Sequence, residues 1–183
     1  MSASTREGPL DEQAYVAFEL ASDVRHEFID GVVRAMTGAS LRHNTVAGNL
    51  FAELRALAKG TPCRVFIEGV RLRVSAKRHY YPDVMVTCEE LTDTHAAAAP
   101  CLVAEVLSPS TTAIDRGEKR MLYFAMPSLR HVLLIDHEGG IVEHMTRATP
   151  DDPWTIHVVQ AGGHLHVDCP AVGAIAVDDI FAN

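Results

Sequence analysis

Cys101-Leu102-Val103-Ala104-Glu105-Val106-Leu107 is a run of residues that is apolar except for one acid. Such a run is typical of a β-strand that is covered on both faces, so we expect it at the centre of a sheet. Helix-like and strand-like segments are interspersed around it, with no internal repeat and no linker. This order predicts a mixed α/β (α+β) fold in which a central β-sheet is flanked by helices.

Two helices and a hairpin are predicted before this strand. Apolar residues recur every three or four positions between Ser40, an expected N-cap, and Lys59, which predicts a long helix. A shorter helix is expected from Leu10 to Ala21. Asp30-Gly31 between two apolar runs predicts a tight hairpin, because both turn residues must take positive φ. Further strands are expected at residues 63–67, 70–74 and 83–87.

After the central strand in the sequence, residues 108–112 are expected to form a turn and to cap a helix that runs from about Ala113 to Met126. The remaining sequence has the alternating or continuous apolar texture of strands. These are expected at residues 131–136, 141–145 and about 154–160, and a short strand and a helical turn should close the chain.

Glu105 is the residue that does not fit its surroundings. Desolvating a carboxylate costs several kcal/mol, so a buried Glu is usually paired or bound to a metal ion. A Glu at a strand end that faces water, or one paired with a buried Arg, is the simpler alternative. The position nevertheless makes Glu105 the first candidate for a functional residue.

Asp83 is the second candidate, because it begins the strand that precedes the Glu105 strand. About a dozen loop residues separate the two strands, so they can be neighbours and can place both carboxylates at one edge of the sheet. A plain turn acid after Tyr81-Pro82 is the alternative.

Asp115 and Lys119 are the third element of the pattern. Their spacing of four residues places them on one face of the helix that follows the Glu105 strand, and Tyr123 continues this face. A solvated surface pair, which contributes only a few tenths of a kcal/mol, is the alternative. Since the helix must pack back over the sheet, its face can also look toward Glu105.

Two carboxylates and a lysine are the groups that metal-dependent phosphodiester hydrolysis requires. Carboxylate oxygens are hard ligands that suit Mg²⁺, which lowers the pKa of bound water and polarises the phosphoryl oxygen. A lysine adds positive charge where the transition state gathers negative charge, and it can help to deprotonate the water. A glycosidase would also need two carboxylates, but it usually has an aromatic-lined cleft, and aromatic residues make up only 6% of this chain.

Composition limits the function classes further. The formal charge of −8 over 183 residues argues against broad coating of DNA, but not against a nuclease with a small footprint. No apolar run approaches the roughly 18 residues of a membrane span. The polar start, Met1 to Gly8, does not look like a signal peptide, so we expect a cytoplasmic protein. Residues 1–10 are expected to be loose, and residues 11–183 to form a single domain.

Cysteine and histidine are the other common metal ligands in this sequence. No two of the four cysteines form a C-x-x-C pair, and each lies in or beside an apolar strand, so we expect buried, reduced thiols. His164 and His166 form an H-x-H pattern, but no third ligand is nearby in the sequence, so we expect them to be solvent-exposed polar residues. The four cysteines are Cys63, Cys88, Cys101 and Cys169.

Several motifs together resemble the Uma-two family of restriction-endonuclease-like proteins, a domain of unknown function within the PD-(D/E)xK nuclease superfamily. The resemblance covers about residues 11 to 147, and the run from Glu105 to Thr111 is its most specific part. The matching motifs are Glu27-Phe28-Ile29-Asp30-Gly31, His43, Tyr81-Pro82-Asp83-Val84, Leu102 to Thr111, Asp115 with Lys119 and Tyr123, and Leu133-Leu134-Ile135-Asp136.

The resemblance implies a restriction-endonuclease-like fold in which Asp83 and Glu105 bind Mg²⁺ or Mn²⁺. The usual E-x-K motif would place a lysine at position 107, which is Leu107 here, and the family's displaced lysine matches Lys119. The early acid of the superfamily matches Glu27. The family positions matched by His43 and Asp115 are possible accessory residues without an assigned role.

Two hypotheses follow from these observations. The first is a Mg²⁺-dependent endonuclease that hydrolyses phosphodiester bonds in nucleic acid, with DNA as the first expectation. The second is a non-catalytic binding or assembly module of the same fold, in which the acids form a structural ion-pair cluster. The module could be a homodimer that pairs through the strand at Ile141 to Met145.

Overall fold

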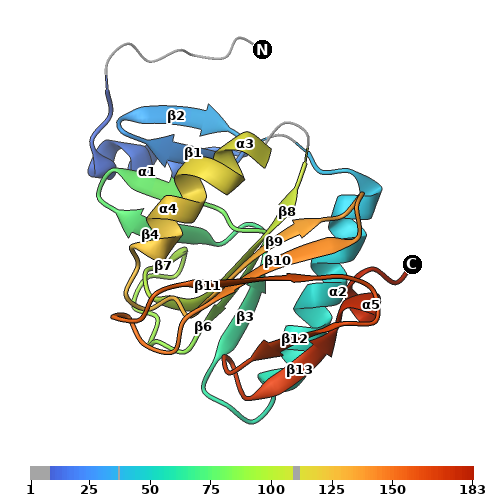
Figure 1. Cartoon of the computed structure of the whole chain (residues 1–183). Coiled ribbons are helices and arrows are strands. Elements are labelled where there is room, and N and C mark those ends of the chain that lie inside the picture. The colour runs from blue at the N-terminus through green and yellow to red at the C-terminus, as the bar shows by residue number, and fades with distance from the viewer. Residues whose placement is uncertain (1–8, 37, 109–111) are drawn as a thin grey trace.

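The computed structural model of the protein describes residues 9–36, 38–108 and 112–183 (Figure 1). Its helical segments are α1 (Glu12–Leu20), α2 (Leu41–Leu57), α3 (Thr112–Ile114), η1 (Asp115–Lys119), α4 (Arg120–Phe124) and α5 (Val177–Ile180). Its strands are β1 (His26–Ile29), β2 (Val32–Ala35), β3 (Arg64–Ile67), β4 (Arg71–Ser75), β5 (Arg78–Tyr80), β6 (Val84–Thr87), β7 (Ala96–Ala97), β8 (Pro100–Leu107), β9 (His131–Asp136), β10 (Ile141–Thr146), β11 (Thr155–Val159), β12 (His164–Val167) and β13 (Gly173–Ala176).

A six-stranded mixed sheet in the order β11-β10-β9-β8-β6-β3 forms the centre of the molecule (Figure 1). β8 is parallel to β9 and antiparallel to β6, and all eight of its residues are buried. The prediction of a central strand covered on both faces is therefore confirmed, as is the mixed α+β class.

The two faces of β8 pack against different hydrophobic clusters. Leu102, Ala104 and Val106 belong to the cluster that α2 covers. Val103 and Leu107 belong to the opposite cluster, which includes residues of α4 and of the second sheet. Because side chains alternate along a strand, Glu105 lies on the second face. Each fully buried Leu or Val contributes roughly 1.5–3 kcal/mol, so this packing fixes β8 firmly.

α2 forms where the apolar periodicity predicts it. Ser40 caps the helix, since its hydroxyl accepts a hydrogen bond of 3.1 Å from the backbone N–H of His43. Val46, Leu50 and Leu54 are fully buried against the sheet. The cap has a second consequence, because it holds His43 in the first turn of α2.

A second sheet, in the order β2-β1-β5-β4-β7, lies beside the central one. The predicted hairpin is confirmed, with Asp30 at φ 48° and Gly31 at φ 89° between β1 and β2. A Cβ on Gly31 would lie 2.6 Å from the Cβ of Pro9, so a side chain does not fit there. Two strands of this sheet were not predicted, because β5 and β7 are only three and two residues long.

The C-terminal hairpin β12–β13 and α5 lie beside α2 (Figure 1). The amide of Asn49 donates to the carbonyl oxygen of Ile180 (3.1 Å), and the guanidinium of Arg42 donates to that of Phe181 (2.7 Å). The tail therefore has one strand more than the sequence predicted. His164 and His166 are exposed, as expected.

Two predictions about pairing are wrong. The strand at Ile141–Met145 is not available to a second molecule, because β10 pairs with β9 on one side and β11 on the other. The cysteines are not separate reduced thiols, because the folding of distant segments joins Cys63 to Cys88 and Cys101 to Cys169.

The ends of the described ranges limit two further predictions. Residues 1–8, for which we expected a loose chain, lie outside the described residues. Leu10, in contrast, is held in place, because its N–H donates a hydrogen bond of 3.0 Å to the carbonyl oxygen of Gly31. The expected turn and cap at residues 108–112 lie partly outside them. Among the described residues, no helix has the length and apolar character needed to cross a bilayer.

His131 and His144 form a buried pair between β9 and β10. His131 Nδ1 lies 3.1 Å from His144 Nε2, and both residues are at most 5% exposed. Burial, together with the charges of His131, His157 and His166, lowers the pKa of His144 to about 3. His144 is therefore neutral in the folded protein at every pH at which an exposed histidine titrates.

We expect this burial to make the protein sensitive to acid. A lowered folded pKa gives stability that is present above the unfolded pKa of about 6.5 and is lost as the pH falls toward the folded value. The free energy of unfolding should fall by roughly 2 kcal/mol through His144 between pH 8 and pH 5. Urea unfolding at both pH values would measure this loss. The His144→Gln variant should show a smaller one, and an equal loss in both proteins would contradict the assignment.

Candidate active site

One cavity of about 430 Å³ collects all the site residues that the sequence predicted. It lies where the first turn of α2, the start of β6, the end of β8 and the η1 segment meet. The predicted residues that line it are Glu27, His43, Asp83, Glu105, Asp115 and Lys119.

Lys119 lies at the centre of the charged groups. Its Nζ is 2.9 Å from Glu27 Oε1, 3.2 Å from Asp115 Oδ1 and 3.3 Å from Glu105 Oε1. The side chain is only 7% exposed, so the alternative of a solvated surface pair with Asp115 is wrong. The E-x-K position is occupied by Leu107 in this chain, and Lys119 supplies the interior cation in its place.

The local geometry of the helix turns Asp115 and Lys119 inward. Residues Asp115–Lys119 form a π-helical segment, in which the N–H of Arg120 bonds to the carbonyl oxygen of Asp115. The sequence predicted an ordinary α-helix here. Asp115 and Lys119 are buried, while the three residues between them face solvent. Such π-helical insertions occur frequently at functional sites.

Glu105 is held by two donors on one oxygen. Its Oε1 lies 3.3 Å from Lys119 Nζ and accepts a hydrogen bond of 2.6 Å from the hydroxyl of Tyr123. Within the described part of the chain, Oε2 has no hydrogen-bond donor, and Glu105 lines the cavity. The sequence placed Tyr123 on the correct helix face, but it gave no signal that its hydroxyl would bind Glu105.

Asp83 is fixed beside Glu105 by the pairing of β6 with β8. Its Oδ2 accepts a hydrogen bond of 2.7 Å from the backbone N–H of Val106, the residue that follows Glu105. His43 Nε2 lies 3.1 Å from the same oxygen. Among the residues that the structure describes, none donates a hydrogen bond to Oδ1. The expectation that neighbouring strands bring both carboxylates to one edge is therefore confirmed.

Burial dominates the electrostatics of this cavity. It raises the pKa of Asp83 and of Glu105 above the ordinary carboxyl range, and the nearby carboxylates add to the increase. Burial also disfavours the ammonium of Lys119, but the charges of Glu105, Glu27 and Asp115 outweigh it and hold the pKa of Lys119 well above its usual value. These carboxylates therefore favour the charged form of Lys119.

One further group at the cavity, His137, was not predicted. His137 lines the cavity, and its Nδ1 donates a hydrogen bond to the carbonyl oxygen of Leu107 (2.8 Å). The ring centroids of His137 and His43 lie 6.1 Å apart, with the two rings tilted against each other. Burial, followed by the effect of His137, lowers the pKa of His43. His137 follows the apolar strand β9 directly, and no motif in the sequence distinguishes it.

The class of this protein follows from the sheet and the cavity together. A mixed sheet whose central strands bring a buried and a partly buried carboxylate together, beside an interior lysine, is a restriction-endonuclease-like arrangement. A solved structure shares the fold: a putative nuclease belonging to DUF820 from Anabaena variabilis ATCC 29413, with a TM-score of 0.72 and 16% sequence identity. The match covers 94% of this chain and 98% of the other.

The chain belongs to the Uma2 family, described as "Putative restriction endonuclease", whose model matches residues 12–178. Two relatives come from Synechocystis sp. (strain ATCC 27184 / PCC 6803 / Kazusa). The uncharacterized protein slr1290 is 31% identical and aligns with 94% of this chain and 91% of its own length. The uncharacterized protein sll1609 is 34% identical over 78% of this chain and 82% of its own length. Family and fold together support a nuclease-like function.

We expect Lys119 to be essential for the stability of the folded protein. Removing one partner of a buried ion pair typically costs about 3–5 kcal/mol, because it leaves the other charges uncompensated. Urea unfolding of Lys119→Met at pH 8 should show a loss of this size. Arg116→Met is the matched control, since Arg116 is 43% exposed in its contact with Glu143 and should change stability by less than about 1 kcal/mol. Equal losses would contradict the buried cluster.

Proposed function

We propose that the protein is a Mg²⁺- or Mn²⁺-dependent endonuclease-type hydrolase that cleaves phosphodiester bonds in nucleic acid, with DNA as the first substrate. One observation carries the proposal. Glu105 is buried and Asp83 is partly buried, both line the same cavity, and each has one oxygen without a hydrogen-bond donor among the described residues. These two oxygens are the ligands we assign to the metal ion.

The charge of the cluster suits a divalent cation. Lys119 is the ammonium that faces Glu27, Glu105 and Asp115, so their negative charge exceeds its positive charge. Asp83 adds a fourth carboxylate at the same cavity. Buried charge of one sign is costly unless it is paired, and hard oxygen ligands favour Mg²⁺ or Mn²⁺. The residues present therefore fit the metal ion that the family implies.

When bound, the metal ion would polarise the phosphoryl oxygen and lower the pKa of a bound water molecule. The remaining roles belong to side chains of this chain. Lys119 keeps its charge and provides a positive potential where negative charge develops on the phosphate. The Val106 N–H fixes the orientation of Asp83, and Tyr123 fixes that of Glu105. His43 is a positioning residue that holds Asp83 from the other side.

The footprint of the substrate is expected to be small. The cavity lining contains Arg34, an exposed residue of β2, which can contact a phosphate at the rim. Lys119 is occupied by three carboxylates and does not extend to a second phosphate. Together with the net charge of −8, this favours contact with one or two phosphates over a long basic groove.

The first test is the nicking of supercoiled plasmid DNA with Mg²⁺ or Mn²⁺. We expect Glu105→Gln to reduce the rate at least about 100-fold, because a catalytic metal ion supplies several kcal/mol of transition-state stabilisation. Glu90→Gln is the matched control, since Glu90 is exposed and lies in the loop between β6 and β7. Equal cutting by wild type and Glu105→Gln would refute the proposal and point to a contaminating nuclease.

The second test measures metal binding directly. Isothermal titration of the wild type with Mg²⁺ and with Mn²⁺ should give one site, and Asp83→Asn should weaken it at least about tenfold because an ionised ligand is lost. The experiment also separates the two hypotheses. If neither ion gives heat above buffer at millimolar concentrations, the acids are a structural cluster around Lys119, and the protein is a non-catalytic binding or assembly module.

A further inference from the structure

A second cluster of side chains that are able to ligate a metal ion, the cysteines, lies at the opposite end of the strands that carry the acids. β6 begins next to Asp83 and is followed by Cys88, while β8 carries Cys101 near its start and Glu105 near its end. Because β6 and β8 are antiparallel, the two acids meet at one end of the pair and the two cysteines at the other.

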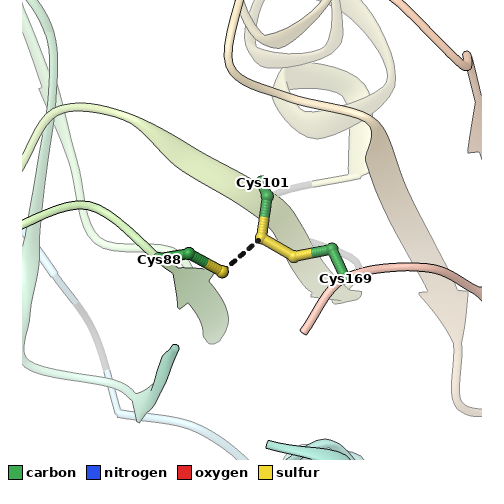
Figure 2. Close-up of side chains that lie close together, drawn as sticks. All are labelled: Cys88, Cys101 and Cys169. Carbon is green, nitrogen blue, oxygen red and sulfur yellow. Dashed lines mark hydrogen bonds between the residues drawn. A yellow bond between two sulfur atoms is a disulfide. The ribbon is translucent and has the colours of Figure 1, made fainter. Parts of the chain in front are cut away.

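Three of the four cysteines converge at this end, and the fourth, Cys63, is bonded to one of them, Cys88. Cys88 and Cys101 approach to 3.8 Å between their sulfur atoms, and each is bonded to a further cysteine, Cys63 and Cys169 respectively. Figure 2 shows how Cys88, Cys101 and Cys169 point toward one another, and their Sγ atoms all lie within 4.8 Å of one another. The sulfurs thus form one continuous cluster and not two distant crosslinks.

We propose that the chain, when its cysteines are reduced, binds one Zn²⁺ ion through the thiolates of Cys63, Cys88, Cys101 and Cys169. Reduction of the two disulfides by an external thiol or phosphine takes four electrons and four protons and yields four thiols. Zn²⁺ then displaces the four thiol protons and forms four Zn–S bonds. Soft thiolate ligands in a closed set of four are typical of structural zinc sites.

The spacing of the sulfurs fits this ion. A tetrahedral zinc with Zn–S bonds of about 2.3 Å places its sulfur ligands about 3.8 Å apart. Cys88 and Cys101 already have this separation. After reduction, rotation about the Cα–Cβ bonds lets the sulfurs of each bonded pair separate to the spacing of zinc ligands. Cys63 Sγ also lies 3.6 Å from the carbonyl oxygen of Pro170, which keeps it beside Cys169.

The surroundings are those of a structural site with an entry path. Cys88 is exposed, whereas Cys101 and Cys169 are 9% and 1% exposed. Arg130 places a cation nearby, because its N–H donates to the carbonyl oxygen of Cys101 and its guanidinium donates to the Asp168 carboxylate. Because this guanidinium is already paired with Asp168, it adds no net charge, and the contact of the Arg130 backbone to the Cys101 carbonyl oxygen positions that strand residue.

The ligands come from four separate segments of the fold. Cys63 precedes the edge strand β3, Cys88 follows β6, Cys101 lies in β8, and Cys169 lies in the loop of the β12–β13 hairpin. A zinc ion held by all four would connect the edge strand and the C-terminal hairpin to the two central strands. The site would therefore act on folding stability and not on the chemistry of the Asp83 cavity.

The test uses the full chain, reduced and stripped of metal with a chelator. We expect it to take up one equivalent of Zn²⁺, measured by elemental analysis after gel filtration, and to unfold at a higher temperature once loaded. Co²⁺ should give the visible bands of a tetrahedral site and a sulfur-to-cobalt charge-transfer band. Cys88→Ser, at the exposed ligand, should weaken Zn²⁺ affinity by more than the roughly 10- to 100-fold that loss of an outer-shell partner costs.

A further variant and a thiol titration complete the test of the zinc site. The Asp83→Asn variant should keep the full Zn²⁺ stoichiometry and the Co²⁺ spectrum, which separates this site from the proposed active site. Thiol titration of the reduced protein should give four thiols before metal is added and none that react rapidly afterwards. The proposal is wrong if the disulfides resist reduction, if the reduced chain binds no Zn²⁺, or if Cys88→Ser binds it as tightly as the wild type.

Discussion

The structure depends on the burial of a carboxylate in the middle of its central strand. Glu105 is 3% exposed, and a carboxylate in such a position destabilises the folded state by several kcal/mol unless other groups compensate it. Lys119 and Tyr123 supply that compensation from the helical segment that follows β8. Their contacts also fix where this segment packs on the sheet. One electrostatic requirement in β8 thus determines the position of the helix above it.

The same requirement explains why the cavity is charged and not apolar. Lys119 is surrounded by three carboxylates, so it satisfies Glu105 without neutralising the cluster. The surplus negative charge would be a liability in a purely structural core, where a hydrophobic replacement is often at least as stable. Retaining it is understandable if a cation enters the cavity. Buried titratable groups whose arrangement lowers the stability of the folded protein are typical of functional sites.

Much of this arrangement could be predicted from the sequence, and the failures have identifiable causes. The apolar run of β8 and the Asp30-Gly31 turn are local signals, and the structure reproduces both. The direction in which Lys119 points is not local, because spacing of four residues fits an exposed pair and a buried pair equally well. The π-helical turn that rotates it inward has no sequence signature. The convergence of the cysteines required knowledge of which strands are neighbours.

The position of the lysine shows that the positive charge of the site can come from the helical segment instead of from the strand that carries Glu105. Leu107 lies two residues beyond Glu105 on the same face of β8, where a lysine of the E-x-K pattern would stand, and it is 5% exposed in the core cluster with Tyr123. An ammonium there would replace apolar packing at a cost of a few kcal/mol unless it were fully paired. Lys119 reaches Glu105 from the helix and leaves this packing intact. Because the same helical segment also brings Asp115, the displaced lysine arrives with a carboxylate partner of its own. The charges of Glu105, Glu27 and Asp115 hold Lys119 in the charged form that electrostatic stabilisation of a phosphate requires.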